Sequence, residues 1–256
     1  MKALVTGAGS GIGRALAVCL GQDSYDILAV GRDEQKLHDT AALVQTHTEC
    51  LHADLSNREE CFELYQRIKD DDIEIVINNA GFGVFGPFSE TDLGSELSML
   101  DVNIESVHIL TKLFIKDFIR KNHGYILNVA SAAAFLPGPL FSSYYASKAY
   151  VLRLTVAIRE ELRRTGVDGV YAGALCPGPV ATPFNDTDGV VRSLPGLSPM
   201  RVARYALRKM YAKRTVIVPG LPQKLLQVGA KLVPESIAVR IVWSVQKHKL
   251  GPKSTL

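Results

Sequence analysis

A glycine-rich turn near the start of the chain constrains the fold more than any other feature of the sequence. An apolar segment at residues 2–6 leads into the turn, which reads Gly-Ala-Gly-Ser-Gly-Ile-Gly from Gly7 to Gly13. Glycines permit backbone conformations that other residues avoid, and they let the main chain approach a diphosphate. The helix expected from about Ile12 would present free N–H groups to that anion. The pattern predicts a strand–turn–helix unit for a dinucleotide, although a plain tight loop can share it.

Apolar and amphipathic segments then alternate along the chain. We expect further strands at 27–30, 49–53, 73–77, 125–129 and 169–175, and helices at 34–46, 58–69, 92–121 (in one or two pieces) and 143–165. Such alternation joins parallel strands through right-handed helical crossovers. The sequence therefore predicts an α/β fold, a Rossmann-like doubly wound parallel sheet with helices on both faces. Ligands of such sheets bind beyond the carboxyl ends of the strands.

The composition excludes several classes of protein. The chain has 256 residues, 47% of them hydrophobic, which suffices for one domain with a large core. Its four cysteines form no C-x-x-C pair and no histidine cluster accompanies them, so we expect reduced thiols and neither a disulfide framework nor a metal site. Met1 and Lys2 lead directly into an apolar segment, and no run of about 18 apolar residues occurs. We therefore expect a cytoplasmic protein without a signal peptide or membrane span.

The end of the second expected strand carries two opposing signals about the coenzyme. Arg32 suits the 2′-phosphate of NADP(H) and could stack on the adenine, and Arg14 on the first helix adds positive charge nearby. Asp33 suits the free ribose hydroxyl of NAD(H) instead. We expect NADP(H) to be preferred, with NAD(H) as the alternative.

Three polar residues follow the strand expected at 125–129. Tyr144 and Lys148 are four residues apart on a predicted helix, which places them on one face. We expect the Lys148 ammonium to lower the pKa of the Tyr144 phenol and make it a general acid or base. Ser131 can donate a hydrogen bond to a substrate oxygen. Tyr145 has Ala149 at the matching position and lacks such a lysine.

These motifs occur together in one known family. Besides the turn, the chain carries Ala-Asp-Leu at 53–55, Asn-Asn-Ala-Gly at 78–81, Val-Asn at 102–103, Ser131, Tyr-Tyr-Ala-Ser-Lys at 144–148 and Cys-Pro-Gly-Pro-Val-Ala-Thr at 176–182. Over about residues 1–183 the sequence resembles the short-chain dehydrogenase/reductase family. The resemblance implies hydride transfer with NAD(P)(H) and a catalytic set of Asn103, Ser131, Tyr144 and Lys148. Asn103 would link Lys148 to a water-mediated proton relay.

The resemblance also implies which residues hold the cofactor. They are Gly7, Gly9, Ser10, Gly11, Ile12, Gly13, Arg32, Asp54, Leu55, Asn79, Ala80, Gly81, Tyr144, Lys148, Pro177, Gly178, Val180 and Thr182. Lys148 would hold the hydroxyls of the nicotinamide ribose. Two structural alternatives remain open: Asn78 could only brace the sheet, and Asp54 could only cap the next helix.

The segments around the expected site favour a lipophilic ketone, oxoacyl or steroid-like substrate. Their apolar residues are Phe82, Val84 and Phe85, together with Leu136, Pro139, Leu140 and Phe141. We expect residues 183–200 to form a loop that closes on the substrate. An NAD-dependent alcohol or steroid dehydrogenase and a non-catalytic NADP(H)-binding sensor are the alternatives. The resemblance further implies a homodimer or homotetramer.

The last quarter of the chain is strongly basic. Residues 190–256 contain 13 lysines and arginines and a single acid, Glu235. We expect residues 1–200 to form the NAD(P)-binding catalytic domain, and residues 201–256 to form a basic helical extension of it with a short edge strand at 216–219. The favoured interpretation is packing on the domain or a partner subunit. The alternative is that this segment contacts an anionic membrane surface or guides a lipid-like substrate. Few aromatic residues are interleaved, so we expect no nucleic-acid partner.

Overall fold

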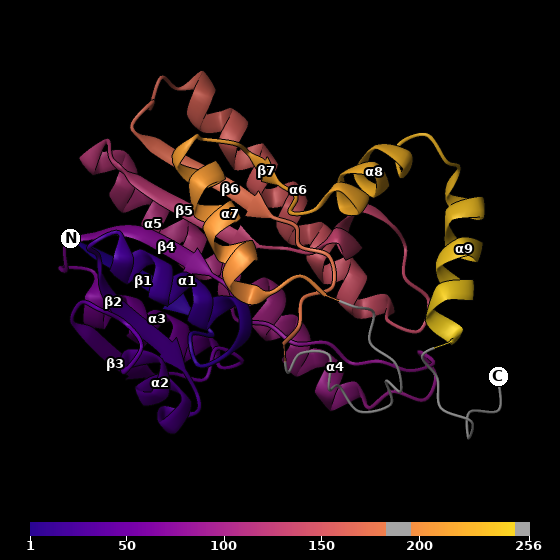
Figure 1. The fold of residues 1–256 in the computed structure, drawn as a ribbon, viewed down its shortest axis with the longest axis horizontal. Helices are drawn as coiled ribbons and strands as arrows, with labels where there is room; N and C mark the ends of the chain where they lie inside the picture. The colour runs from indigo at the N-terminus through magenta and orange to yellow at the C-terminus, as the bar shows by residue number, and fades with distance from the viewer. Residues whose placement is uncertain (183–195, 249–256) are drawn as a thin grey trace.

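A seven-stranded parallel sheet forms the centre of the computed structural model, which describes residues 1–182 and 196–248 (Figure 1). The strands are β1 (Lys2–Thr6), β2 (Asp26–Gly31), β3 (Thr48–His52), β4 (Ile73–Asn78), β5 (Gly124–Val129), β6 (Val170–Leu175) and β7 (Val216–Ile217). Their order is β3-β2-β1-β4-β5-β6-β7, and every neighbouring pair is parallel. The predicted doubly wound sheet is confirmed. Strands β2 and β3 are added on one side of β1 and strands β4 to β7 on the other, so the topological switch point lies between β1 and β4. Such folds bind ligands at this point.

Helices cover both faces of the sheet. On one face α1 (Gly11–Gln22), α2 (Glu34–Ala41) and α7 (Pro199–Tyr211) pack on the strands; on the other lie α3 (Arg58–Ile68), α5 (Val107–Lys121) and α6 (Ser142–Arg164). The strands supply both cores because successive side chains point to opposite faces. In β1, for example, Ala3 and Val5 belong to one apolar cluster and Leu4 to the other.

Two expected helices differ from the observed ones. The helix expected at 34–46 ends at Ala41, because the following residues fold onto α1, where Gly21 leaves room for the Val44 side chain. The helix expected at 92–121 is α4 (Leu93–Leu100) joined to α5 through the π-helix η1 (Asp101–Ser106). A short 3-10 turn, η2 (Ala132–Phe135), follows β5.

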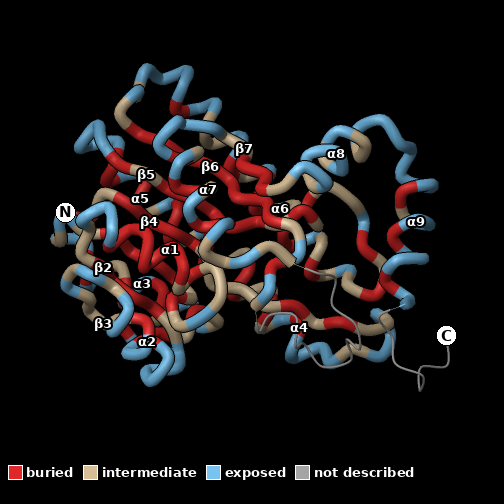
Figure 2. Tube along the Cα trace, in the orientation of Figure 1, coloured by how far each residue is buried: buried red, intermediate tan, exposed pale blue. Residues whose placement is uncertain are grey.

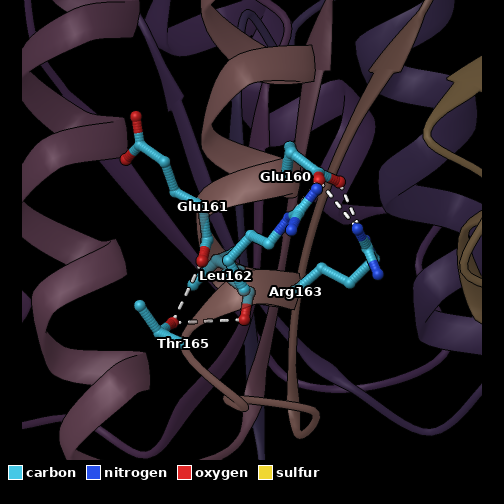
Figure 3. A network of polar contacts seen from close by, with 6 residues as sticks. Glu160, Glu161, Leu162, Arg163 and Thr165 are labelled. Carbon is cyan, nitrogen blue, oxygen red and sulfur yellow. Dashed lines mark hydrogen bonds and ion pairs between the residues drawn. The ribbon is translucent and has the colours of Figure 1, made fainter.

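The carboxyl end of α6 is closed by its own polar side chains (Figure 3). Glu160 accepts hydrogen bonds from Arg163 and Arg164, and Thr165 donates to the carbonyls of Glu161 and Leu162. Hydrogen bonds from Arg163 and Arg164 lower the pKa of Glu160 to about 2. The ion pairs are exposed and contribute little to stability, whereas the Thr165 hydroxyl satisfies two backbone carbonyls at the end of the helix opposite to Tyr144.

The C-terminal region divides into a part that packs and a part that is largely exposed. α7 buries Val202, Ala206 and Met210 against the sheet and α1. By contrast α8 (Leu221–Gly229) has no buried residue, and α9 (Glu235–Lys247) buries Ala238, Val242 and Gln246 (Figure 2). Within the described residues, every helix is too short or too polar to cross a bilayer.

Candidate active site

A cavity of about 530 Å³ lies at the carboxyl ends of β1, β4, β5 and β6. We call its strand side the cavity floor, which consists of Gly7, Ser10, Gly11, Ile12, Asn79, Ala80, Gly81, Val129, Ala130, Ser131, Ala132, Ala133, Tyr144, Lys148, Pro177, Gly178, Pro179, Val180 and Thr182. We call the opposite side the cavity roof, which consists of Leu226 from α8 and Ile241, Val242, Val245 and Gln246 from α9. The cavity thus occupies the place where the fold predicts a ligand.

The glycine turn is held in a conformation that a side chain would not tolerate. Gly7 and Gly11 have φ angles of +64° and +55°, and a Cβ on Gly13 would stand 2.1 Å from the Gly7 carbonyl oxygen. The Asn79 amide donates to the carbonyls of Thr6 and Gly7 at 2.9 and 3.2 Å and ties the turn to the end of β4. The main chain therefore has no side chain and keeps a defined conformation at the place where a diphosphate would lie.

Arg32 and Asp33 differ in what they are bound to. Asp33 caps α2 by accepting a hydrogen bond from Lys36 N at 3.0 Å, and its carboxylate pairs with Lys36 Nζ at 2.9 Å. These interactions hold the pKa of Asp33 below its usual range. Arg32 is exposed, and no hydrogen bond or ion pair joins it to another described residue. Arg14, expected to offer charge, instead donates to the Gly9 carbonyl and to Thr40 and braces the turn.

Asp54 does not cap the next helix, so that alternative is wrong. Asn57 is the cap of α3, and Asp54 accepts hydrogen bonds from the backbone and hydroxyl of Ser56 at 3.0 and 2.8 Å. Burial acts to raise the pKa of Asp54, but the hydrogen bonds from Ser56 and the nearby Arg32 charge outweigh this effect, so the pKa lies below its usual value.

Asn78 does brace the sheet, since its amide donates to Thr111 and Asn128 at 3.1 and 2.8 Å.

Ser131, Tyr144 and Lys148 meet at the cavity floor. Tyr144 lies in the first turn of α6, and Ser131, which follows β5, hydrogen-bonds to it. Lys148 Nζ donates to the Val129 carbonyl at 3.0 Å and stands 5.9 Å from the centre of the Tyr144 ring. The three side chains are brought together as the spacing predicted, and all of them line the cavity.

The expected effect of Lys148 on Tyr144 is wrong for the cavity as the structure shows it. Burial raises the pKa of Tyr144 to about 12, with the Ser131 hydrogen bond opposing it. Burial also lowers the pKa of Lys148 to about 8, so the ammonium itself is poorly stabilised. Desolvation is the largest cause of both shifts, and Lys148 Nζ lies over the Tyr144 ring and donates to the Val129 carbonyl.

Asn103 lies beside this group, buried in the π-helix η1. Its amide donates to the Phe82 carbonyl at 2.9 Å and to Ser147 Oγ at 3.1 Å, while its oxygen accepts from Phe82 N. A Cβ on Gly81 would stand 2.6 Å from Asn103 Oδ1 and 3.1 Å from Lys148 Nζ, so a side chain at this position would collide with both groups. π-Helices often occur at functional sites, and the sequence pattern did not reveal this one.

Comparison with known proteins assigns the chain to a family. The family model described as short chain dehydrogenase matches residues 1–189. This chain belongs to the short-chain dehydrogenase family. It is therefore an NAD(P)-dependent oxidoreductase that acts on CH–OH or C=O groups.

Two sequence relatives and one solved structure illustrate the similarity of this short-chain dehydrogenase to known members. An uncharacterised oxidoreductase of Staphylococcus saprophyticus is 32% identical over 215 residues, which cover 81% of this chain and 91% of that protein. Estradiol 17-beta-dehydrogenase 11 of Mus musculus is 28% identical over 255 residues, 98% of this chain and 84% of that protein. The structure of a short-chain dehydrogenase from Sphingobium yanoikuyae in complex with NADPH has a TM-score of 0.80 and 25% identity, covering 100% of this chain and 98% of that one.

Some of the other predicted residues of this short-chain dehydrogenase line the cavity, and others do not. Gly9, Gly13, Arg32, Asp54, Leu55 and Asn103 lie outside its lining, and so do Phe82, Val84, Pro139 and Leu140 among the predicted substrate contacts. Phe85, Leu136 and Phe141 do line it, and the Phe141 ring stacks on Tyr144 with centroids 4.4 Å apart. The predicted closing loop falls mainly on residues 183–195, which lie outside the described residues.

Sequence reasoning did not name Tyr145 or the roof residues as part of the site, although one alternative gave the C-terminal segment a role in guiding the substrate. Tyr145 lines the cavity and accepts a hydrogen bond from Gln246 Nε2 at 2.8 Å. A stripe at four-residue spacing (Ala238, Val242 and Gln246) marks the buried face of α9 and could have indicated that this helix packs over the site.

Across residues 1–182 and 196–248 no cluster of three or more histidine, cysteine or acidic side chains could hold a metal, and all four cysteines are free thiols.

Proposed function

We propose that this short-chain dehydrogenase transfers hydride between NADP(H) and the carbonyl or alcohol carbon of a lipophilic substrate, with Tyr144 as general acid and base. A ketone, an oxoacyl compound or a steroid-like molecule fits this description. The observation that carries the proposal is the meeting of Ser131, Tyr144 and Lys148 in one cavity, whose lining is otherwise largely apolar. The naming of the mouse relative as an estradiol dehydrogenase supports a substrate of this kind.

The cavity floor offers the groups that a carbonyl reduction needs. Ser131 and Tyr144 would hold the carbonyl oxygen, and Tyr144 would give it a proton as negative charge develops there. After the transfer, Ser131 and the new alcohol hydroxyl can donate to the Tyr144 phenolate and stabilise it against the effect of burial. Lys148, whose pKa of about 8 suits proton exchange near neutral pH, would replace that proton through water near Asn103. Alcohol oxidation would run these proton transfers backwards.

A dinucleotide suits the shape of the floor. Gly7 and Gly11 place main chain without side chains in the floor, and the turn exposes the amino end of α1 there. When bound, the nicotinamide would supply or accept the hydride. We propose that it is held by the predicted glycine-turn residues, by Asn79 to Gly81, by Lys148 and by the segment from Pro177 to Thr182.

The 2′-phosphate of NADP(H) is the proposed partner of Arg32. Arg32 extends from the end of β2 without a competing partner among the described residues, whereas Asp33 is engaged by α2 and Lys36. The positive charge of Arg32 also lowers the pKa of Asp54, the residue predicted to flank the adenine, so the two side chains are near each other. The related structure from Sphingobium yanoikuyae was solved with NADPH, which supports the same choice. NAD(H) remains the alternative coenzyme.

Reduction of apolar ketones by NADPH tests the proposal. In Tyr144→Phe, kcat should fall by about 10²–10⁴ because the proton donor is lost, while NADPH affinity is retained. Tyr150→Phe is the matched control, since Tyr150 lies on the outer side of the same helix and bonds to His108. If the wild-type protein binds NADPH but reduces no carbonyl compound and oxidises no alcohol, the non-catalytic sensor is the better description.

We further propose that residues 201–256 extend the catalytic domain and that the protein is a homo-oligomer. Buried side chains of α7 and α1 belong to the same apolar cluster, which supports one domain. Ile119 of α5 and Tyr150 and Val156 of α6 are partly exposed apolar side chains on the long central helices, where a second copy could pack. Light scattering after size exclusion would measure the assembly, and a monomer at micromolar concentration would contradict it.

An anionic membrane is the proposed partner of the outer surface of α8 and α9. This surface exposes Leu221, Leu225 and Leu232 beside the exposed Lys224 and Lys231. Apolar side chains with neighbouring lysines suit a peripheral membrane contact. Cosedimentation with vesicles containing phosphatidylserine should fall in Lys224→Ala/Lys231→Ala and at high salt. Absence of binding at low salt would leave packing against a partner subunit as the explanation.

A further inference from the structure

Tyr145 and Gln246 form a second polar pair in the cavity, separate from Ser131, Tyr144 and Lys148. Gln246 lies in the last turn of α9 and is only 2% exposed, although it is polar; the other two buried residues of this helix, Ala238 and Val242, are apolar. Its Nε2 donates to the Tyr145 hydroxyl at 2.8 Å. Both residues line the cavity. The pair therefore joins the roof to the first turn of α6.

The position of Tyr145 is fixed by packing. Gly138 lies directly under its ring, where a Cβ would come within 2.2 Å of the ring atoms, and the Phe141 ring meets it edge-on at 6.1 Å. Because consecutive residues of a helix point in different directions, Tyr144 and Tyr145 present their hydroxyls to different parts of the cavity. Their ring centroids are 6.3 Å apart.

The Gln246 amide is only half satisfied. Its Oε1 is buried and has no hydrogen-bond partner among the described residues. Tyr145 can donate or accept one bond to the amide, so one end of the amide is left whichever way it is turned. Buried polar groups are normally paired, and those that are not often have a ligand or water as partner. In an apolar cavity such a group selects for a ligand that satisfies it.

A hydroxyl group matches what this pair offers. It can donate its proton to Gln246 Oε1 and accept the proton of the Tyr145 hydroxyl. A carboxylate or phosphate would need a cation, and Lys148 is the one charged residue in the described lining. An uncharged polar group on an apolar skeleton therefore fits best.

We propose that Gln246 and Tyr145 bind a hydroxyl group of the substrate that is several bonds away from the reacting carbonyl. The inference rests on the proposed function and deepens it: the substrate class becomes an apolar hydroxy-ketone, or the corresponding diol in the oxidative direction. Gln246 and Tyr145 are specificity-determining residues in this scheme, since they touch the substrate away from the reacting atoms.

Straight-chain methyl ketones of increasing length, each with and without a terminal hydroxyl, provide the test. Binding to the full chain with oxidised coenzyme present is measured through the fluorescence of Trp243, the single tryptophan, which lies on α9. This measurement does not require turnover. Reduction of the same ketones with NADPH is measured in parallel as kcat/KM.

At the best chain length, the hydroxylated ketone should bind about tenfold more tightly than its partner. Gln246→Leu should remove that preference, and Tyr145→Phe should reduce it, which guards against a misfolded Gln246 variant. Gln66→Leu, the same change at an exposed position on α3, should leave the preference intact.

The outcomes separate this proposal from the proposed function. If both ketones are reduced but bind equally, or if Gln246→Leu keeps the preference, the second polar site is overturned and the reductase stands. If the preference exists and is lost in Gln246→Leu while nothing is reduced, the site stands and the reductase is overturned. If neither ketone binds or reacts at any length, both are overturned.

Discussion

The floor and the roof of the cavity are built in different ways. The floor lies at the ends of buried strands, and its polar groups are bound to the backbone, as Asn79 is to Thr6 and Lys148 to Val129. The roof comes from α8 and α9, of which α8 buries nothing and α9 buries three residues. The floor is therefore rigid and suited to a fixed coenzyme and a fixed chemistry. The roof is weakly attached, so it can differ without disturbing the fold and is suited to selecting the substrate.

The largest expected difference concerns core packing. Ile126 in β5 is 0% exposed, whereas Leu232, which follows α8, is 79% exposed. Ile126→Ala should lower the free energy of unfolding by about 2–5 kcal/mol, because it leaves a cavity between sheet and helices. Leu232→Ala should change it by less than about 0.5 kcal/mol. Urea unfolding measures both, and a comparable loss in Leu232→Ala would mean that a partner covers this residue.

The second prediction compares two arginines, Arg32 at the proposed coenzyme site and Arg240 on α9, by their effect on coenzyme binding. Arg32→Ala should weaken NADPH binding by about 1.5–3 kcal/mol, or roughly tenfold to a hundredfold, and leave NADH binding nearly unchanged. Arg240→Ala, at an exposed position on α9, should alter neither. Fluorescence titration with both coenzymes gives the answer. Equal affinity for NADH and NADPH in the wild-type protein would assign the ribose to Asp33 and the coenzyme to NAD(H).

Two glycines make a matched test of the floor and the roof. A Cβ on Gly13 would stand 2.1 Å from the Gly7 carbonyl oxygen, whereas nothing lies within 4 Å of one on Gly229 in α8. Gly13→Ala should cost about 1–3 kcal/mol of stability and weaken NADPH binding, since the turn must shift. Gly229→Ala should be neutral or stabilise by up to about 1 kcal/mol. A normal NADPH affinity in Gly13→Ala would show that the turn is not a coenzyme site.

The smallest expected effect is a pH slope from the buried lysine. Lys148 has a pKa of about 8 in the folded protein and 10.5 when exposed, so between these values the unfolded chain binds more protons. Raising the pH should therefore stabilise the folded state by up to about 1 kcal/mol per pH unit. Buried thiols, whose pKa values are raised, oppose this trend, so the difference from Lys148→Met is the quantity to measure.

Urea unfolding at several pH values between 8 and 10 keeps Tyr144 protonated in the folded protein, since burial raises its pKa from 10 to about 12. Ionisation of tyrosines in the unfolded chain is shared with Lys148→Met and cancels in the difference. The wild-type protein should gain stability relative to Lys148→Met as the pH rises. A constant difference would mean that Lys148 keeps its ordinary pKa in the folded state.

Local patterns were sufficient for the sheet, the glycine turn and the catalytic group, whereas the family resemblance implied the rest of the floor. The alternation of apolar and amphipathic segments predicted the parallel sheet, and residue spacing predicted that Tyr144 and Lys148 share a face. Both depend on interactions between residues close in sequence, where helix and strand periodicities apply. The direction of the Tyr144 and Lys148 pKa shifts did not follow, because desolvation depends on everything that surrounds a group.

The sequence by itself determined the fold, the glycine turn and the grouping of Ser131, Tyr144 and Lys148. The turn and Ser131 directly follow strands whose ends are fixed by the parallel sheet, and Tyr144 and Lys148 share one face of the helix after β5. Only the tertiary structure decided what closes the cavity. Tyr145 and Gln246 are 101 residues apart, and no periodicity links them. They meet because α9 returns across the carboxyl ends of the strands and buries one stripe of side chains there, an arrangement set by packing between distant segments.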